Sequence, residues 1–189
     1  MRHVRPAGIE PRRTARSHIV LAYTIAGVIV AADLLTKRWA ASSFRDGPQT
    51  IIPRVLTFRF TENPGAAFSM FQNAGPFLGV AAVIAVGVIG ALLARPRPTH
   101  EAVAFGMIIG GALGNLIDRI ARGEGFLDGK VIDWVQLPDF PTFNVADSSV
   151  SVAVAVLLIG SWRSGSAASK QSKLDNEATG QAGRDDVQA

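Results

Sequence analysis

The chain has 189 residues, of which 48% are hydrophobic and only 18% are charged, and its mean hydropathy is +0.26. Since an ordinary soluble domain carries about a quarter charged residues, this composition argues against a cytosolic globular protein. Cysteine is absent and only three histidines occur, which excludes disulfides and thiolate sites and leaves little for zinc binding or a Ser-His triad.

The formal net charge of +4 arises in the first 18 residues, which contain five arginines and one glutamate. Basic and acidic groups balance over the rest of the chain. An arginine-rich leader next to an apolar segment is typical of the cytoplasmic flank of a membrane anchor. We therefore predict a basic cytoplasmic leader over 1–18 and no nucleic-acid partner.

Four apolar segments follow this leader, and their lengths predict four membrane-spanning helices. They cover residues 19–41, 76–94, 102–120 and 147–162. The second has 19 residues without a charge, close to the roughly 20 that cross a bilayer core. The segments lack the polar face that a core helix of a soluble bundle would have. The membrane domain is thus predicted to cover 19–162, followed by a polar, aperiodic tail over 163–189 that we expect to be disordered and cytoplasmic.

The positions of lysine and arginine in the short flanks predict the orientation of these helices. The leader and the turn that contains Arg95 and Arg97 are expected in the cytoplasm, so residues 42–75 and 121–146 lie outside and both termini lie inside. In the first outer segment, apolar and polar residues alternate from Val55 on, which predicts a short strand. The predicted fold class is an all-α polytopic membrane protein, with four transmembrane helices and a small extracytoplasmic region that contains β-structure.

In this orientation, polar residues from three of the helices come together at one depth, near the outer face of the membrane. The group consists of Asp33, Lys37, Asn115, Asp118, Arg119, Asn144 and Asp147, with Asp133 in the loop before the fourth helix. Ionisable residues in or beside membrane helices are costly to bury, which makes this group a candidate functional site.

Structural roles compete with that interpretation. Asp33 and Lys37 are four residues apart, as an ion pair on one helix face requires. Asp118 and Arg122 have the same spacing. Asp147 precedes two serines and an apolar run, which is typical of a helix N-cap. On spacing alone, these roles are better supported than a catalytic one.

Acid–base catalysis by two carboxylates is the chemistry for which this group offers the most candidates. Two adjacent carboxylates share a proton, so that one accepts a proton from water while the other donates to the carbonyl under attack. Spacing does not choose among four candidates, which are Asp33, Asp118, Asp133 and Asp147. A Ser-Lys pair formed by Lys37 and Ser148 is the other option.

Five short blocks connect these residues to a known family. The blocks are DLLTK at 33–37, NPGAAF at 63–68, GNLIDR at 114–119, VIDW at 131–134 and FNVADS at 143–148. Together they resemble, in order and in membrane position, the blocks of the lipoprotein signal peptidases (signal peptidase II), which are four-span bacterial membrane aspartyl peptidases. The Asn-Pro-Gly at the start of the second block also predicts a turn.

This resemblance implies a membrane aspartyl endopeptidase that removes the signal peptide from prolipoproteins by cutting before a diacylglyceryl-modified cysteine. It implies that Asp133 and Asp147 are the catalytic carboxylates and that no metal or cofactor takes part. The residues it implies in substrate binding or in shaping the site are Asp33, Lys37, Asn63, Gly65, Asn115, Asp118, Arg119 and Asn144. The expected partners are prolipoprotein substrates and membrane lipid, for a monomer in the cell membrane whose site lies near the outer leaflet.

Two other functions fit a four-span protein with charges in its helices. An ion transporter or channel subunit would use the charges as an ion path, but the second predicted helix lacks any ionisable group. A non-catalytic assembly protein would use them only as structural ion pairs, and replacing its carboxylates would lower activity only in proportion to expression.

Overall fold

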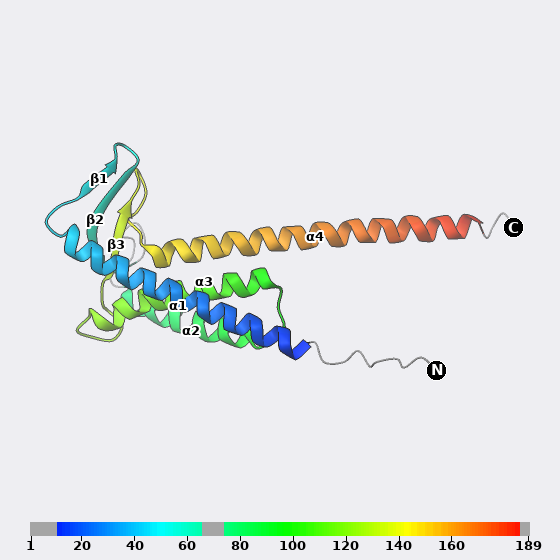
Figure 1. The fold of residues 1–189 in the computed structure, drawn as a ribbon, viewed down its shortest axis with the longest axis horizontal. Helices are drawn as coiled ribbons and strands as arrows, with labels where there is room; N and C mark the ends of the chain where they lie inside the picture. The colour runs from blue at the N-terminus through cyan, green and yellow to red at the C-terminus, as the bar shows by residue number, and fades with distance from the viewer. Residues whose placement is uncertain (1–10, 66–73, 186–189) are drawn as a thin grey trace.

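The computed structural model describes residues 11–65 and 74–185, and side chains within 16–65 and 74–166. Its elements, in chain order, are α1 (Pro11–Ser43), β1 (Gln49–Ile52), β2 (Leu56–Asn63), α2 (Gly75–Leu93), α3 (Thr99–Ala121), β3 (Val131–Gln136) and α4 (Val145–Asp185). The helices lie side by side, the three strands form a small sheet at one end, and α1 begins and α4 ends on the side away from that sheet (Figure 1).

Four helical stretches are long and apolar enough to cross a membrane, which confirms the four predicted spans. They are Arg16–Ser43, Gly75–Leu93, Thr99–Ala121 and Val145–Ser166. In the third, 56% of the most apolar window is buried within the protein, against 11 to 17% in the other three. The other three helices therefore present most of their apolar side chains outward, as contact with lipid requires.

Helix α3 occupies the centre because it packs against α1, α2 and α4. Its small residues permit this close packing. A Cβ on Gly106 would overlap the backbone carbonyl oxygen of Ala22 in α1. A Cβ on Gly111 would approach the carbonyl oxygen of Ala146 in α4 to 2.5 Å. Each glycine thus allows a neighbouring backbone to lie against α3.

The sheet has the order β1-β2-β3, and both pairings are antiparallel. The strand predicted from Val55 on is confirmed, since β2 begins one residue later and covers Leu56–Asn63. Strand β3 corrects the expectation that Asp133 lies in a loop, because Asp133 pairs with Thr61 of β2. The partner strand lies about 70 residues earlier in the chain, so this pairing has no local signal in the sequence.

An aromatic cluster holds the sheet against the end of α1. Trp39 of α1 makes edge-to-face contacts with Phe58 of β2 and Trp134 of β3, with ring centroids 5.6 and 5.4 Å apart. Phe44, just after the helix, also packs against Trp39 and Phe58. Each such contact adds about 0.5–1.5 kcal/mol beyond burial of apolar area. The cluster therefore places β3, and with it Asp133, beside the helices.

Helix α4 continues through Asp185, which corrects the expected disorder of the tail over 163–185 as far as secondary structure is concerned. The segment also contains alanine, lysine, glutamine and glutamate, which favour helix. Because it extends an existing helix, it also avoids the cost of nucleation. The division into leader, membrane domain and tail stays a prediction, and residues 1–10 of the leader lie outside the described part of the chain.

Candidate active site

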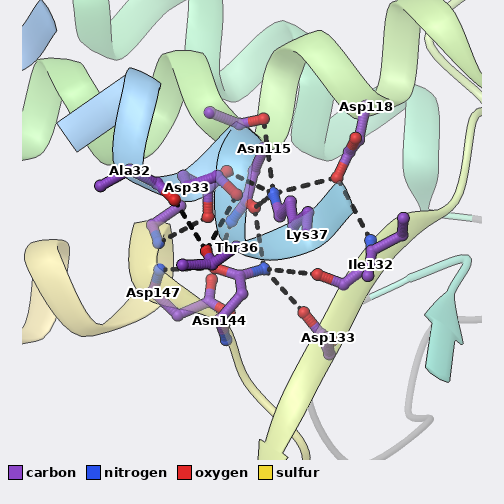
Figure 2. Close-up of polar contacts among 12 residues, drawn as sticks. Ala32, Asp33, Thr36, Lys37, Asn115, Asp118, Ile132, Asp133, Asn144 and Asp147 are labelled. Carbon is purple, nitrogen blue, oxygen red and sulfur yellow. Dashed lines mark hydrogen bonds and ion pairs between the residues drawn. The ribbon is translucent and has the colours of Figure 1, made fainter. Parts of the chain in front are cut away.

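A buried lysine lies at the centre of the polar group (Figure 2). Lys37 is 1% exposed, and its ammonium lies 2.6 Å from Asp33 Oδ2 and 2.9 Å from Asp118 Oδ2. The predicted ion pair between Asp33 and Lys37 is therefore confirmed. Asp118, from α3, is a second partner that spacing within α1 does not reveal. Pairing offsets the large cost of burying these charges.

The two carboxylates also hold neighbouring elements at this centre. Asp33 Oδ1 accepts a hydrogen bond from the Ala146 backbone N–H in α4, at 3.0 Å. Asp118 Oδ2 accepts one from the Ile132 N–H in β3, at 3.2 Å. Asp118 Oδ1 pairs with Arg122 at 2.8 Å, which confirms the second predicted i, i+4 pair. The ion cluster thus positions the strand that carries Asp133 and the helix that carries Asp147.

Asp133 lies on β3, is buried, and has a hydrogen-bond donor at each carboxyl oxygen. Asn144 Nδ2 donates to Oδ1 at 2.7 Å, and Asn63 Nδ2 donates to Oδ2 at 3.0 Å. Burial disfavours the charged form, and the negative charge of Asp147 adds to this effect, so the pKa of Asp133 is raised to about 7. Asp133 is therefore able to hold or release a proton near neutral pH.

Asp147 lies in the first turn of α4. Its backbone N–H donates to Asn144 Oδ1 at 3.0 Å, and the Asn144 backbone N–H donates to Asp147 Oδ2 at 3.2 Å. This reciprocal pair is a capping box, in which Asn144 is the N-cap. The prediction that Asp147 is the N-cap is therefore wrong by three residues. Its remaining oxygen, Oδ1, accepts a hydrogen bond from Asn115 Nδ2 at 2.8 Å.

Two asparagine side chains connect the carboxylates, and each has only one possible amide orientation. The ammonium of Lys37 can only donate, so the atom of Asn115 that lies 2.9 Å from it is oxygen, and the Asn115 NH2 faces Asp147. The Ile132 carbonyl can only accept, so the Asn144 atom at 3.2 Å is nitrogen. Since Asn144 Nδ2 also lies 3.1 Å from Asn115 Oδ1, the chain of contacts is continuous.

The Asn-Pro-Gly stretch of the first outer segment forms a turn beside Asp133. Asn63 Oδ1 accepts a hydrogen bond from the Gly65 N–H at 3.0 Å, which confirms the predicted turn. Arg119 Nη2 of α3 donates to the Gly65 carbonyl at 3.3 Å. This contact ties the turn to the bundle. The rest of the NPGAAF block, from Ala66 on, lies outside the described residues.

The predicted site residues form two sets, those that line a cavity of about 680 Å³ and those that do not. Its wall contains Asn63, Gly65, Asn115, Arg119, Asp133 and Asp147. Asp33, Lys37, Asp118 and Asn144 lie behind this wall and hold it in place through the contacts described above. The cavity also has an apolar lining from α2, α3 and α4, for example at Leu78, Ala112 and Val152.

The loop over 137–142 also lines this cavity, through Leu137, Phe140, Pro141 and Thr142. Sequence reasoning missed this loop, whose only signal is its two prolines. The alternative Ser-Lys pair is not formed among the described residues. Ser148 Oγ donates to the Asn144 carbonyl at 2.9 Å, whereas Lys37 contacts the carboxylates and Asn115.

Two carboxylates line one cavity, the buried Asp133 with a pKa near 7 and the half-buried Asp147, and this is the arrangement that aspartic hydrolases use. Because this pair of carboxylates lies among helices that are long and apolar enough to cross a membrane, the protein is a membrane enzyme by class. Residues 25–163 match the signal peptidase (SPase) II family.

Individual relatives agree with this match. The chain is 40% identical over 153 residues to a lipoprotein signal peptidase of Rhodococcus jostii, covering 79% of this chain and 75% of that protein. A lipoprotein signal peptidase of Mycobacterium avium is 39% identical over 158 residues, covering 82% of each chain. The fold is similar to that of a solved bacterial membrane enzyme, with a TM-score of 0.67 at 28% identity, covering 75% of this chain and 87% of that one.

The chain therefore belongs to the lipoprotein signal peptidase family, and its activity is that of signal peptidase II, an aspartic peptidase.

Proposed function

We propose that Asp133 and Asp147 are the catalytic carboxylates of this peptidase, and that it cuts prolipoproteins immediately before a diacylglyceryl-modified cysteine. The observation that supports this choice most directly is the shared cavity, because Asp133 and Asp147 line it whereas Asp33 and Asp118 are held behind it by Lys37. A catalytic group must reach the reacting atoms, which only the first pair does here.

In the proposed reaction, Asp147 starts as the carboxylate and Asp133 carries the proton. The first turn of a helix stabilises negative charge, which suits Asp147, and the raised pKa of Asp133 suits a proton donor near neutral pH. Asp147 removes a proton from water, whose oxygen attacks the scissile carbonyl, while Asp133 donates its proton to the carbonyl oxygen.

The tetrahedral intermediate then breaks down with the protons returned. Asp147 gives its proton to the departing amine nitrogen as the carbon–nitrogen bond breaks, and Asp133 takes back the proton from the hydroxyl group as the new carboxyl group forms. One water is consumed and both carboxyl groups regain their starting states. Asn115 and Asn144, which donate to Asp147 and Asp133 respectively, keep both oxygens oriented throughout.

The site residues that line the cavity and those that lie behind it receive different roles in this proposal. Asn63, Gly65, Asn115 and Arg119 line the cavity and are assigned to substrate binding. Asp33, Lys37, Asp118 and Asn144 are assigned to shaping the site, because they act through the groups they hold. The apolar wall over α2 to α4 suits the apolar end of a signal peptide and the acyl chains of the modified cysteine.

The proposed orientation places both termini in the cytoplasm and the sheet with its cavity at the outer leaflet. Two observations support it, which are the excess of arginine in the leader and the position of the sheet at the opposite end of the helices from the start of α1 (Figure 1). We propose a monomer whose exposed apolar helix faces contact membrane lipid.

The test is cleavage of a diacylglyceryl-modified prolipoprotein by the purified enzyme in detergent. Asp133→Asn and Asp147→Asn should each lower kcat by at least about 10²- to 10⁴-fold while the protein still folds and melts cooperatively. Asp46→Asn is the matched control, because Asp46 is an exposed aspartate of the outer segment that lines neither this cavity nor a neighbouring one. Near-normal activity in Asp133→Asn would overturn the dyad.

A further inference from the structure

A second cavity, of about 630 Å³, lies on the sheet side of the active site. Its lining comes from the β1–β2 turn, from strands β2 and β3 and from the loop over 137–142. None of its lining residues belongs to a helix that could cross a membrane. The second cavity therefore belongs to the segments that connect the helices, not to the membrane-spanning helices themselves.

This second cavity joins the first one beside Asp133. Asn63, Asp133, Leu137, Phe140, Pro141 and Thr142 line both. A peptide whose scissile bond lies at Asp133 thus has two spaces to occupy, one on each side of that bond. The first has an apolar wall from the helices, whereas the second contains the charged residues Arg54, Glu62 and Asp139.

Two of these charged residues have an unusual backbone. In the described part of the chain, three non-glycine residues have positive φ, which are Arg54 at 61°, Leu127 at 56° and Asp139 at 54°. Two of the three line the second cavity. A left-handed backbone is costly for a residue other than glycine, and such residues cluster at ligand sites because the surrounding structure holds a side chain in a required place.

We propose that the second cavity is the subsite for the polar peptide segment that follows the lipid-modified cysteine, and that Arg54 and Asp139 select the charge of that segment. This inference rests on the proposed function. The signal peptide and the acyl chains are apolar and match the first cavity, so the hydrophilic segment that follows the modified cysteine must leave toward water. An extended segment that passes Asp133 enters the second cavity directly.

The charges predict a preference that can be measured. Glu62 already has a basic neighbour, since Lys130 lies 3.8 Å from it. Arg54 is exposed, and no ion pair of Arg54 or Asp139 occurs among the described residues. Arg54 should favour an acidic residue soon after the cysteine, and Asp139 a basic one. Neutralising Arg54 should therefore shift the preference toward basic segments, and neutralising Asp139 should shift it toward acidic ones.

The experiment uses three diacylglyceryl-modified substrates that carry Asp, Ala or Lys directly after the cysteine. Cleavage is measured with wild type, Arg54→Gln and Asp139→Asn, and kcat/KM is compared as the ratio of the Asp to the Lys substrate. Asparagine is chosen at 139 because it tolerates positive φ. Arg59→Gln is the matched control, since Arg59 is an exposed arginine of β2 outside both cavities.

We expect Arg54→Gln to lower the Asp/Lys ratio by about twofold to fivefold and Asp139→Asn to raise it by a similar factor, the range of partly exposed charge pairs. High salt should reduce both shifts. An unchanged ratio in both variants, or an equal shift in Arg59→Gln, would overturn the subsite while cleavage of the Ala substrate still supports the proposed function. Failure of wild type to cut any lipidated substrate would overturn both.

Discussion

The buried ion cluster makes a quantitative prediction for Lys37→Met. Methionine fills a similar volume but leaves Asp33 and Asp118 without their shared cation, although both carboxylates are almost completely buried. Removing one partner of a buried ion pair costs about 3–5 kcal/mol. Here the cost falls mainly on Asp33, which is left with neither water nor a counterion, whereas Asp118 keeps Arg122. We therefore expect a loss of this size in the free energy of unfolding.

The assay is thermal unfolding in detergent, with cleavage measured on the same samples. For a chain of this length, about 3–5 kcal/mol corresponds to a decrease of roughly 6–20 °C in melting temperature. Activity should also decrease below the unfolding temperature, because Asn115 loses the donor that fixes its orientation toward Asp147.

Lys130→Met is the matched control for this prediction. Lys130 is half exposed and lies 3.8 Å from Glu62, so its ion pair should contribute less than about 1 kcal/mol. The double variant Asp33→Asn with Lys37→Met should recover part of the loss, since one uncompensated charge is removed. If Lys37→Met melts within about 2 °C of wild type and retains full activity, the cluster does not position the site and the reasoning above is wrong.

Two further predictions concern pH and helix packing. Folding raises the pKa of Asp133 from 3.8 to about 7, so the stabilising effect of its proton is complete below pH 4 and is lost as pH rises through 7. The melting temperature of wild type should therefore decrease from pH 4 to 8, and Asp133→Asn should lack this contribution to the slope. For the same reason cleavage should decline above pH 7 as the donor proton is lost. Gly106→Ala should destabilise by about 1–3 kcal/mol because its Cβ meets the Ala22 carbonyl, whereas Gly27→Ala, with no atom within 4 Å of the new Cβ, should be neutral in the same melting assay.

The local features of this protein could be predicted from sequence because each depends on residues that are close in the chain. Hydropathy over about 20 residues predicts a span, and the i, i+4 spacing of Asp33 and Lys37 predicts their ion pair. The orientation of the helices, predicted from the positions of lysine and arginine, then places the polar residues of three helices at one depth in the membrane. The resemblance to the lipoprotein signal peptidases selected Asp133 and Asp147, which spacing alone could not do.

The remaining features depend on contacts between distant segments. Only the tertiary structure pairs Lys37 with Asp118, 81 positions later, and only strand pairing converts the expected loop around Asp133 into β3. Asn144 is the N-cap because its Oδ1 accepts the Asp147 N–H, and Asp33 of α1 accepts the Ala146 N–H of the same turn. Sequence determined which polar residues the membrane domain carries, since that is a matter of composition and spacing. The packing of α1, α3, α4 and β3 decided which of them face the cavity, because a carboxylate held by a buried ammonium cannot also reach a substrate.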